Sequence, residues 1–138
     1  MQNGEDLLFV YGTLKRGYQR HSVLSRQRFL GRAGSVAPGR LFDCGEYPGL
    51  VLCTDGNSIK GELYSVSQQC LDACDQVEGV SEGLYARHKL RVRVLRPGAP
   101  INTGNLAEAV LEAWTYLYLL PAEHLPDCGH EWPAVNRP

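Results

Sequence analysis

Two short stretches of the 138-residue sequence contain residue types that could do chemistry. The first is Tyr11-Gly12-Thr13-Leu14, a glycine turn at the end of an apolar run. Successive backbone N–H groups in such a turn can converge on a carboxylate or on the oxyanion of a carbonyl addition. Gly12 has no side chain to keep a ligand away from the backbone. Taken alone, the turn is more typical of an ordinary strand connection and specifies no reaction.

The second stretch places a carboxylate, Glu78, at the end of a helix predicted over Ser67–Val77. The negative pole of the helix dipole disfavours the charged form of a carboxylate there. Burial would raise its pKa further, and such a group can accept and return a proton near pH 7. A single glutamate is more often a solvated helix cap. The neighbouring acids are expected to be solvated: Asp72, Asp75 and Glu82.

Hydrophobic patterning predicts the elements that would position these residues. The apolar run 7–11 is typical of a buried strand, and polar residues 13–20 predict a loop after it. A short helix is expected within 21–29. Residues 31–53 are rich in Gly and Pro, which predicts brief extended pieces separated by turns at Pro38-Gly39 and Pro48-Gly49.

A hairpin turn is predicted at Asp55-Gly56-Asn57, followed by a strand over 59–66. Ser67 is a suitable N-cap for the helix, and Gly79 a residue that commonly follows a helix end. Residues 85–95 alternate clearly and predict a strand. Its two faces are Ala86, His88, Leu90, Val92 and Val94 on one side and Tyr85, Arg87, Lys89, Arg91 and Arg93 on the other.

Residues 109–120 favour a final strand, although periodicity alone does not distinguish it from a helix. The tail from Pro121 has no clear period. We therefore expect one α+β domain over residues 1–138, with a small curved or barrel-like mixed β-sheet and flanking helices.

Composition excludes several classes of protein. The 14 basic and 15 acidic side chains nearly cancel, whereas a nucleic-acid-binding domain would be clearly basic. The most apolar uncharged stretch, 113–122, has about half of the ~20 residues that a membrane-spanning helix needs. The N-terminus has acids where a signal peptide would have Lys or Arg, and five cysteines cannot all pair. We expect a cytoplasmic protein that binds neither nucleic acid nor membrane.

Other chemistries have less support in the sequence. Gly12 and Gly17 have the spacing of a P-loop, but Tyr18-Gln19 follow where Lys-Ser/Thr is required. Three possible ligands in the tail without a clear fourth do not predict a metal site: His124, Cys128 and His130. We expect neither a metal nor a cofactor. The basic face of strand 85–95 is expected to be solvated, with binding of an anionic partner as a weaker alternative.

Together, the motifs resemble the γ-glutamylcyclotransferase-like family. The similarity spans residues 7–119, nearly the whole chain, and the ordered set is far more specific than any one motif. Residues 120–138 have no assignable counterpart. The matching motifs are 8–17, 47–50, 61–64, 78–80 with Tyr85 and Arg87 behind them, and 114–118.

The resemblance implies a cradle-shaped β-barrel with flanking helices. In the family, the loop that matches Tyr11, Gly12, Thr13 and Leu14 binds the glutamyl end of the substrate through backbone amides. The family's catalytic glutamate maps onto Glu78. A tyrosine that lines the pocket in some members maps onto Tyr116, with Tyr118 as the alternative match.

The implied activity is that of an amide-cleaving lyase or acyltransferase that needs no cofactor. The α-amine of a γ-glutamyl amide attacks its own γ-carbonyl, and 5-oxoproline and an amine or amino acid are released. The main alternative is a non-catalytic module that binds a small carboxylate or an amino acid, because related proteins share a fold more readily than a function. The sequence leaves the departing amine and the oligomeric state open.

Overall fold

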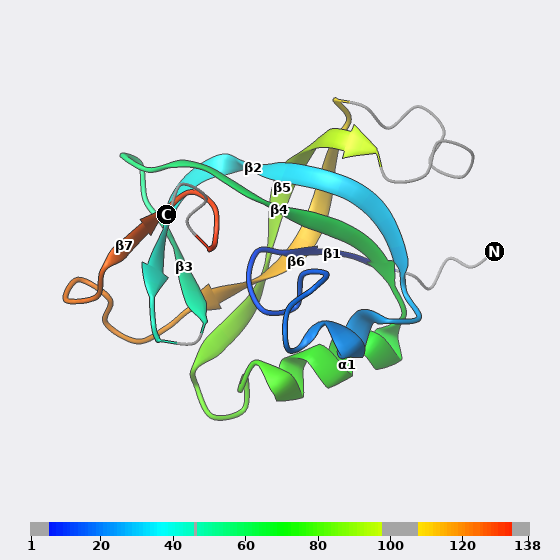
Figure 1. Cartoon of the computed structure of the whole chain (residues 1–138), viewed down its shortest axis with the longest axis horizontal. Helices are drawn as coiled ribbons and strands as arrows, with labels where there is room; N and C mark the ends of the chain where they lie inside the picture. Colours follow the sequence, from blue (N-terminus) through cyan, green and yellow to red (C-terminus); the bar gives the residue numbers. More distant parts are fainter. Residues whose placement is uncertain (1–5, 46, 98–107, 134–138) are drawn as a thin grey trace.

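The structure, a computed structural model, describes residues 6–45, 47–97 and 108–133 (Figure 1). Seven strands, one α-helix and one short 3₁₀ helix (η1) make up this part of the chain. In sequence order they are β1 Asp6–Val10, η1 His21–Leu24, β2 Arg28–Asp43, β3 Pro48–Leu52, β4 Asn57–Val66, α1 Gln68–Val77, β5 Tyr85–Pro97, β6 Val110–Tyr118 and β7 Asp127–Gly129.

Five of the strands close into a barrel. They follow the order β2-β4-β1-β6-β5, and β5 pairs with β2 again to complete the ring. The sheet is mixed because β1 runs parallel to β6, whereas β1 and β4 are antiparallel. The short strands β3 and β7 pair only with β2. This architecture confirms the α+β, barrel-like mixed sheet predicted from the sequence.

The sixteen-residue strand β2 is the main difference from the predicted elements. It runs through Pro38-Gly39, so the predicted turn there is wrong. The register with β4 is irregular between Gly34 and Pro38, and the strand then pairs with β3. A proline fits at such a bulge because its missing N–H does not interrupt a regular ladder. Pro48-Gly49 likewise belongs to the start of β3 rather than to a turn.

The connection between β3 and β4 contains a turn but makes no hairpin. The backbone N–H of Gly56 donates to the carbonyl of Cys53 at 3.2 Å. Both strands pair with β2, one on each side, and not with each other. The predicted helix within 21–29 is reduced to the four-residue η1, because β2 already begins at Arg28.

Strand β1 is buried on both faces, which explains its uninterrupted apolar sequence. Phe9 packs inside the barrel, together with Leu41, Ile59, Leu63, Val92 and Val94. Leu8 and Val10 face outward and are covered by α1 and η1, in a second cluster with Leu24, Tyr64, Val66, Leu71 and Cys74. Cys70 and Cys74 lie on the buried side of α1, as expected for small apolar residues.

Helix α1 begins and ends where the sequence predicts. The Ser67 hydroxyl accepts a hydrogen bond from the Cys70 N–H at 3.1 Å, and Gly79 takes a φ of +72° after the last turn. Glu78 is therefore the C-terminal cap residue. No helix in the described ranges is long and apolar enough to cross a membrane.

Candidate active site

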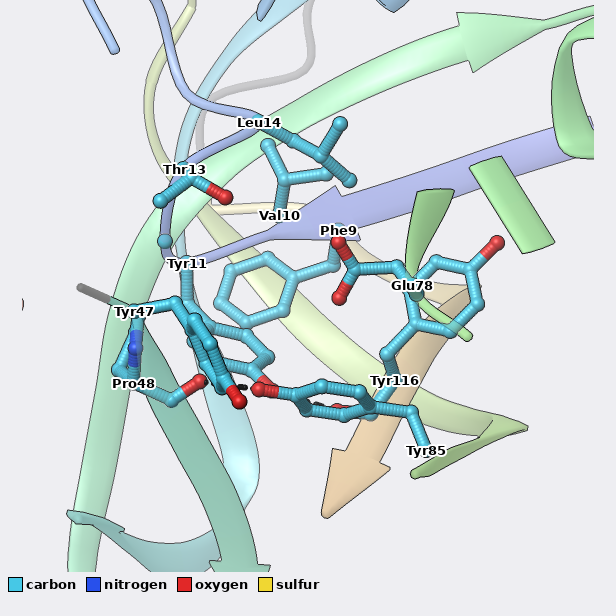
Figure 2. A pocket seen from close by; sticks show the side chains of 11 residues that line it. Phe9, Val10, Tyr11, Thr13, Leu14, Tyr47, Pro48, Glu78, Tyr85 and Tyr116 are labelled. Atoms are coloured by element: carbon cyan, nitrogen blue, oxygen red, sulfur yellow. Dashed lines mark hydrogen bonds between the residues drawn. The ribbon is translucent and has the colours of Figure 1, made fainter. Parts of the chain in front are cut away.

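The end of β1, the residues after α1 and the start of β5 surround one hollow (Figure 2). The empty space in and around it, open solvent at the mouth included, is about 300 Å³. All six site residues predicted from the sequence line it: Tyr11, Gly12, Thr13, Leu14, Glu78 and Tyr116. The other lining residues are Phe9, Val10, Tyr47, Pro48 and Tyr85. The fold thus brings the glycine turn and Glu78 together from opposite halves of the chain.

The Glu78 carboxyl group points into this hollow (Figure 2). Its side chain is 11% exposed, and the guanidinium Nη1 of Arg20 lies 3.5 Å from Oε2. Burial raises the pKa of Glu78 from 4.5 to about 7, and the charge of Arg20 opposes part of that increase. The alternative interpretation of Glu78 as a solvated helix cap is therefore wrong. A carboxyl group with this pKa can both accept and donate a proton near neutral pH.

The glycine turn lines the same hollow as Glu78. The turn is held by hydrogen bonds from the Lys15 N–H to the Gly12 carbonyl at 3.0 Å and from the Arg20 N–H to the Thr13 carbonyl at 2.9 Å. Among the described residues, no acceptor pairs with the N–H groups of Gly12, Thr13 and Leu14. These three donors are therefore available to a carboxylate or an oxyanion.

Tyr11 fixes the position of the turn. Its buried hydroxyl donates to the Tyr116 carbonyl at 2.7 Å and accepts from the Leu50 N–H at 3.2 Å. These bonds tie the residue after β1 to β6 and β3, so the ring forms a wall of the hollow while the hydroxyl is already engaged. The contribution of Tyr11 to the site is therefore mainly one of position.

Asp75 is partly buried and paired, contrary to the prediction of a solvated side chain. Its Oδ1 accepts a hydrogen bond from the Tyr116 hydroxyl at 2.7 Å and lies 3.0 Å from the Arg87 Nε. The Arg87 guanidinium also packs 4.4 Å from the Trp114 ring centre. Asp75 lies three residues before Glu78, so these contacts bind the last turn of α1 to β5 and β6.

The same packing corrects the predicted faces of β5. Tyr85 and Arg87 are covered because α1 lies over this end of the strand, whereas His88 is exposed. Farther along, Arg91 and Arg93 are solvent-exposed as predicted, while Leu90, Val92 and Val94 point into the barrel.

Besides Phe9 and Val10, three lining residues and one residue beside the hollow were not predicted as site residues. The Tyr85 hydroxyl donates to the Pro48 carbonyl at 2.7 Å, and Tyr47 packs beside Tyr85 with ring centres 6.3 Å apart. These three lie within motifs that carry the family resemblance, so a signal was present. Arg20 has no such signal, since its proximity to Glu78 depends on the conformation of the loop.

The C-terminal segment packs on the same loop from the other side. The buried Lys15 ammonium group donates to the Trp132 carbonyl, and the Trp132 ring lies 5.3 Å from that of Tyr18. Arg32 forms an ion pair with Glu131 at 2.9 Å. No group of three or more His, Cys, Asp or Glu side chains in the described ranges could hold a metal ion.

We expect Trp132→Ala to loosen the loop over residues 13–20. Losing the ring contact with Tyr18 costs about 1 kcal/mol, so the amides of this loop should exchange their hydrogens about fivefold faster. Hydrogen exchange followed by mass spectrometry measures this directly. Glu123→Ala, an exposed change in the same segment, is the matched control. Unchanged exchange over 13–20 in the Trp132 variant would contradict a clamping role.

The raised pKa of Glu78 predicts how stability depends on pH. The folded protein binds a proton at Glu78 more tightly than the unfolded chain, so this stabilisation is complete below pH 4.5 and is lost as the pH rises through about 7. The free energy of unfolding should fall by about 3 kcal/mol over that window. In Glu78→Gln that fall should be missing. Denaturant unfolding at pH 5 and pH 8 measures it, and parallel pH dependence of the two proteins would refute the assignment.

The fold and the site define a small β-barrel protein in which a buried carboxyl group and backbone donors without a partner in the described ranges line one hollow. The family model described as "Gamma-glutamyl cyclotransferase, AIG2-like" matches residues 8–134. This chain belongs to that family, which confirms the resemblance seen in the sequence.

Individual relatives agree. The chain is 38% identical to human gamma-glutamylaminecyclotransferase over 118 residues, covering 80% of this chain and 76% of that protein. It is 33% identical to the gamma-L-glutamyl-butirosin B gamma-glutamyl cyclotransferase of Niallia circulans, covering 80% of this chain and 65% of that enzyme. A crystal structure of a mouse AIG2-like protein superposes with a TM-score of 0.74 at 30% identity, covering 90% and 86% of the two chains.

The lengths of the relatives differ from that of this chain. The matches cover 65% of the Niallia circulans enzyme and 64% of both a putative gamma-glutamylcyclotransferase of Vibrio cholerae and the rat gamma-glutamylaminecyclotransferase. The chain thus spans slightly under two thirds of the length of these relatives.

Proposed function

We propose that the protein is a γ-glutamylcyclotransferase that closes the glutamyl group of a γ-glutamyl amide into 5-oxoproline and releases an amine or amino acid. The observation that carries the proposal is the shared hollow, which is lined both by the buried Glu78 and by Gly12, Thr13 and Leu14, whose N–H groups have no acceptor among the described residues. The names of the relatives support the same reaction type.

In the proposed reaction, the α-amine of the substrate attacks its own γ-carbonyl carbon. A C–N bond forms in the new five-membered ring, and the former amide C–N bond breaks. The hollow promotes this by holding the glutamyl chain folded, because reacting groups that are already aligned avoid much of the entropic cost.

Glu78 transfers the protons in this proposal. The α-amine is largely an ammonium ion at neutral pH, and the ionised carboxylate removes a proton so that the nitrogen can attack. The protonated Glu78 then gives a proton to the departing nitrogen. Over the reaction, the attacking nitrogen loses two of its three protons and the departing nitrogen gains two, so no co-reactant is consumed.

The N–H groups after β1 are proposed to stabilise the developing negative charge. Attack converts the γ-carbonyl oxygen into an oxyanion, and fixed donors in a sheltered site stabilise such a charge strongly. The hydrogen bonds of Tyr11 and Lys15 hold these donors in place before substrate binds. Every step uses groups of the chain itself, and no cofactor is needed.

We also propose a cytoplasmic location for the protein. All five cysteines are unpaired: Cys44, Cys53, Cys70, Cys74 and Cys128. Free cysteines in this number are typical of a reducing compartment. γ-Glutamyl compounds of low molecular weight are then the proposed partners, rather than nucleic acids or membranes.

A panel of γ-glutamyl compounds tests the proposal. It should contain γ-glutamyl amino acids, glutathione, γ-glutamyl-lysine and simple γ-glutamyl amines, each assayed for release of 5-oxoproline. We expect release from at least one class, at a rate that depends on Glu78. Tight binding of 5-oxoproline or glutamate without product from any compound would instead favour the non-catalytic binding module.

A further inference from the structure

Arg20 lies at the edge of the hollow, in contact with three of the residues that form it. Its backbone N–H donates to the Thr13 carbonyl, and its guanidinium lies 5.8 Å from the Tyr47 ring centre. The Nη1 atom donates to the Val77 carbonyl at 3.2 Å and lies 3.5 Å from Glu78 Oε2. These contacts hold one end of the guanidinium at the mouth of the site.

The guanidinium has donors to spare. An arginine carries five N–H donors in a planar fork, and here only Nη1 has a partner among the described residues. Nε and Nη2, on the other edge, together match the two oxygens of a carboxylate. The side chain is 33% exposed, so a ligand can reach it. The 3.5 Å separation from Glu78 is longer than that of a strong charge-assisted bond, which leaves the cation only partly neutralised.

The geometry of a γ-glutamyl group brings a carboxylate to this position. Its α-amine and α-carboxylate share one carbon atom, so their nitrogen and oxygen atoms lie within about 3.5 Å of each other. If the amine is hydrogen-bonded to Glu78, a distance of about 2.8 Å, the carboxylate oxygens fall within about 6 Å of the Glu78 oxygens. The Nη1 atom of Arg20, 3.5 Å from Glu78 Oε2, lies within the same distance of the Glu78 oxygens.

We propose that Arg20 binds the α-carboxylate of the substrate and of 5-oxoproline, and that it selects ligands in which this carboxylate is free. The inference rests on the proposed function and assigns the two negatively charged groups of the ligand to different donors of the site. In the closed ring, the carboxylate and the carbonyl oxygen are attached to carbons on either side of the nitrogen, so the two oxygen groups occupy different positions and can be held by different donors. Arg20 takes the carboxylate, and the N–H groups of the glycine turn are left for the oxyanion.

Two ligands of nearly the same shape test the proposal. 5-Oxoproline carries the carboxylate, and 5-oxoprolinamide replaces it with a neutral amide. Calorimetric titration of the parent protein should show about 10- to 100-fold tighter binding of 5-oxoproline, the difference expected for hydrogen bonds to a charged group. Arg20→Gln should bind both ligands equally weakly. Arg20→Lys should keep part of the preference, because lysine offers the charge without the fork.

Arg26→Gln is the matched control, since Arg26 is an exposed arginine in the next segment of the chain. It should keep the parent's preference, whereas a general effect of net charge would reduce the preference in both variants. Melting temperatures of all variants show whether each is folded. Equal loss of affinity for both ligands in Arg20→Gln, or an unchanged preference, overturns the proposal.

Turnover assays separate this inference from the proposed function. Suppose that the parent forms 5-oxoproline from a γ-glutamyl amide, and that Arg20→Gln lowers the turnover of this substrate no more than the turnover of the same compound with an α-carboxamide. The role of Arg20 is then wrong and the enzyme assignment stands. If no substrate is turned over but the binding preference for the carboxylate depends on Arg20, the enzyme assignment fails and the role of Arg20 stands. If no substrate is turned over and neither ligand binds, both are overturned.

Discussion

Replacing Glu78 with glutamine should lower the kcat for 5-oxoproline release by about a thousandfold, within the range of 10²- to 10⁴-fold that proton transfer contributes. Glutamine keeps nearly the same shape but neither accepts nor returns a proton. In the parent, kcat/KM should rise with pH through about 7, because the base must be ionised. The residual activity of the variant should lack this step. Steady-state assays between pH 5.5 and 8.5 measure both effects.

Glu82→Gln is the control for this substitution. Glu82 lies four residues further on, is exposed, and lies outside the hollow. Its replacement removes an equal charge and should leave both the rate and the pH profile unchanged. A Glu78→Gln protein that cyclises substrate at the parent rate would eliminate Glu78 as the acid and base.

Gly12→Ala should lower kcat/KM by about a hundredfold, the usual effect of losing one oxyanion donor. A Cβ atom at this position would lie 2.8 Å from both Cγ and Cδ of Pro48, closer than real contacts allow. The proline ring is stiff and begins β3, so the turn has to shift and its N–H groups move away from Glu78. The same assay with a saturating and a limiting substrate concentration separates kcat from KM.

A second substitution distinguishes this clash from a general requirement for glycine. Pro48→Ala removes both atoms that the new Cβ would meet. Gly12→Ala should therefore cost much less activity when it is added to Pro48→Ala than when it is made in the parent protein. If the two losses are equal, contact with Pro48 is not the reason for glycine at this position.

The sequence was sufficient to predict the elements on which the site depends. The uninterrupted apolar run of β1 identified a strand buried on both faces, and Ser67 with Gly79 marked both ends of α1. These local signals place the glycine turn and Glu78 each at the end of an element. Their meeting in one hollow came from the family resemblance, because no local pattern specifies which strand ends lie side by side.

Other features depend on tertiary packing and were predicted wrongly. Pro38-Gly39 has the composition of a turn, but pairing with β3 and β4 on either side keeps β2 extended through it. Asp75 and Arg87 have the pattern of solvated residues, yet α1 covers the start of β5 and brings them into contact. Propensity is a weak guide wherever a neighbouring element supplies the partner.

Glu78 also shows why the general preference for a solvated glutamate at a helix end does not apply at this position. Holding a carboxyl group out of water at a helix C-terminus destabilises the folded protein at neutral pH, as the expected fall in unfolding free energy expresses. Such costs are common at functional sites, where activity requires a group that stability alone would not favour. A carboxyl group that is buried at the expense of stability is therefore itself a signal of function.

The central claim is that Glu78 and the amides after β1 act on the same ligand. Titration of the labelled protein with 5-oxoproline, followed by NMR, tests this most directly. We predict that the amide signals of Gly12, Thr13 and Leu14 and the side-chain carboxyl carbon of Glu78 shift together, with one dissociation constant. Saturable shifts at the amides with the Glu78 signal unmoved would contradict the claim.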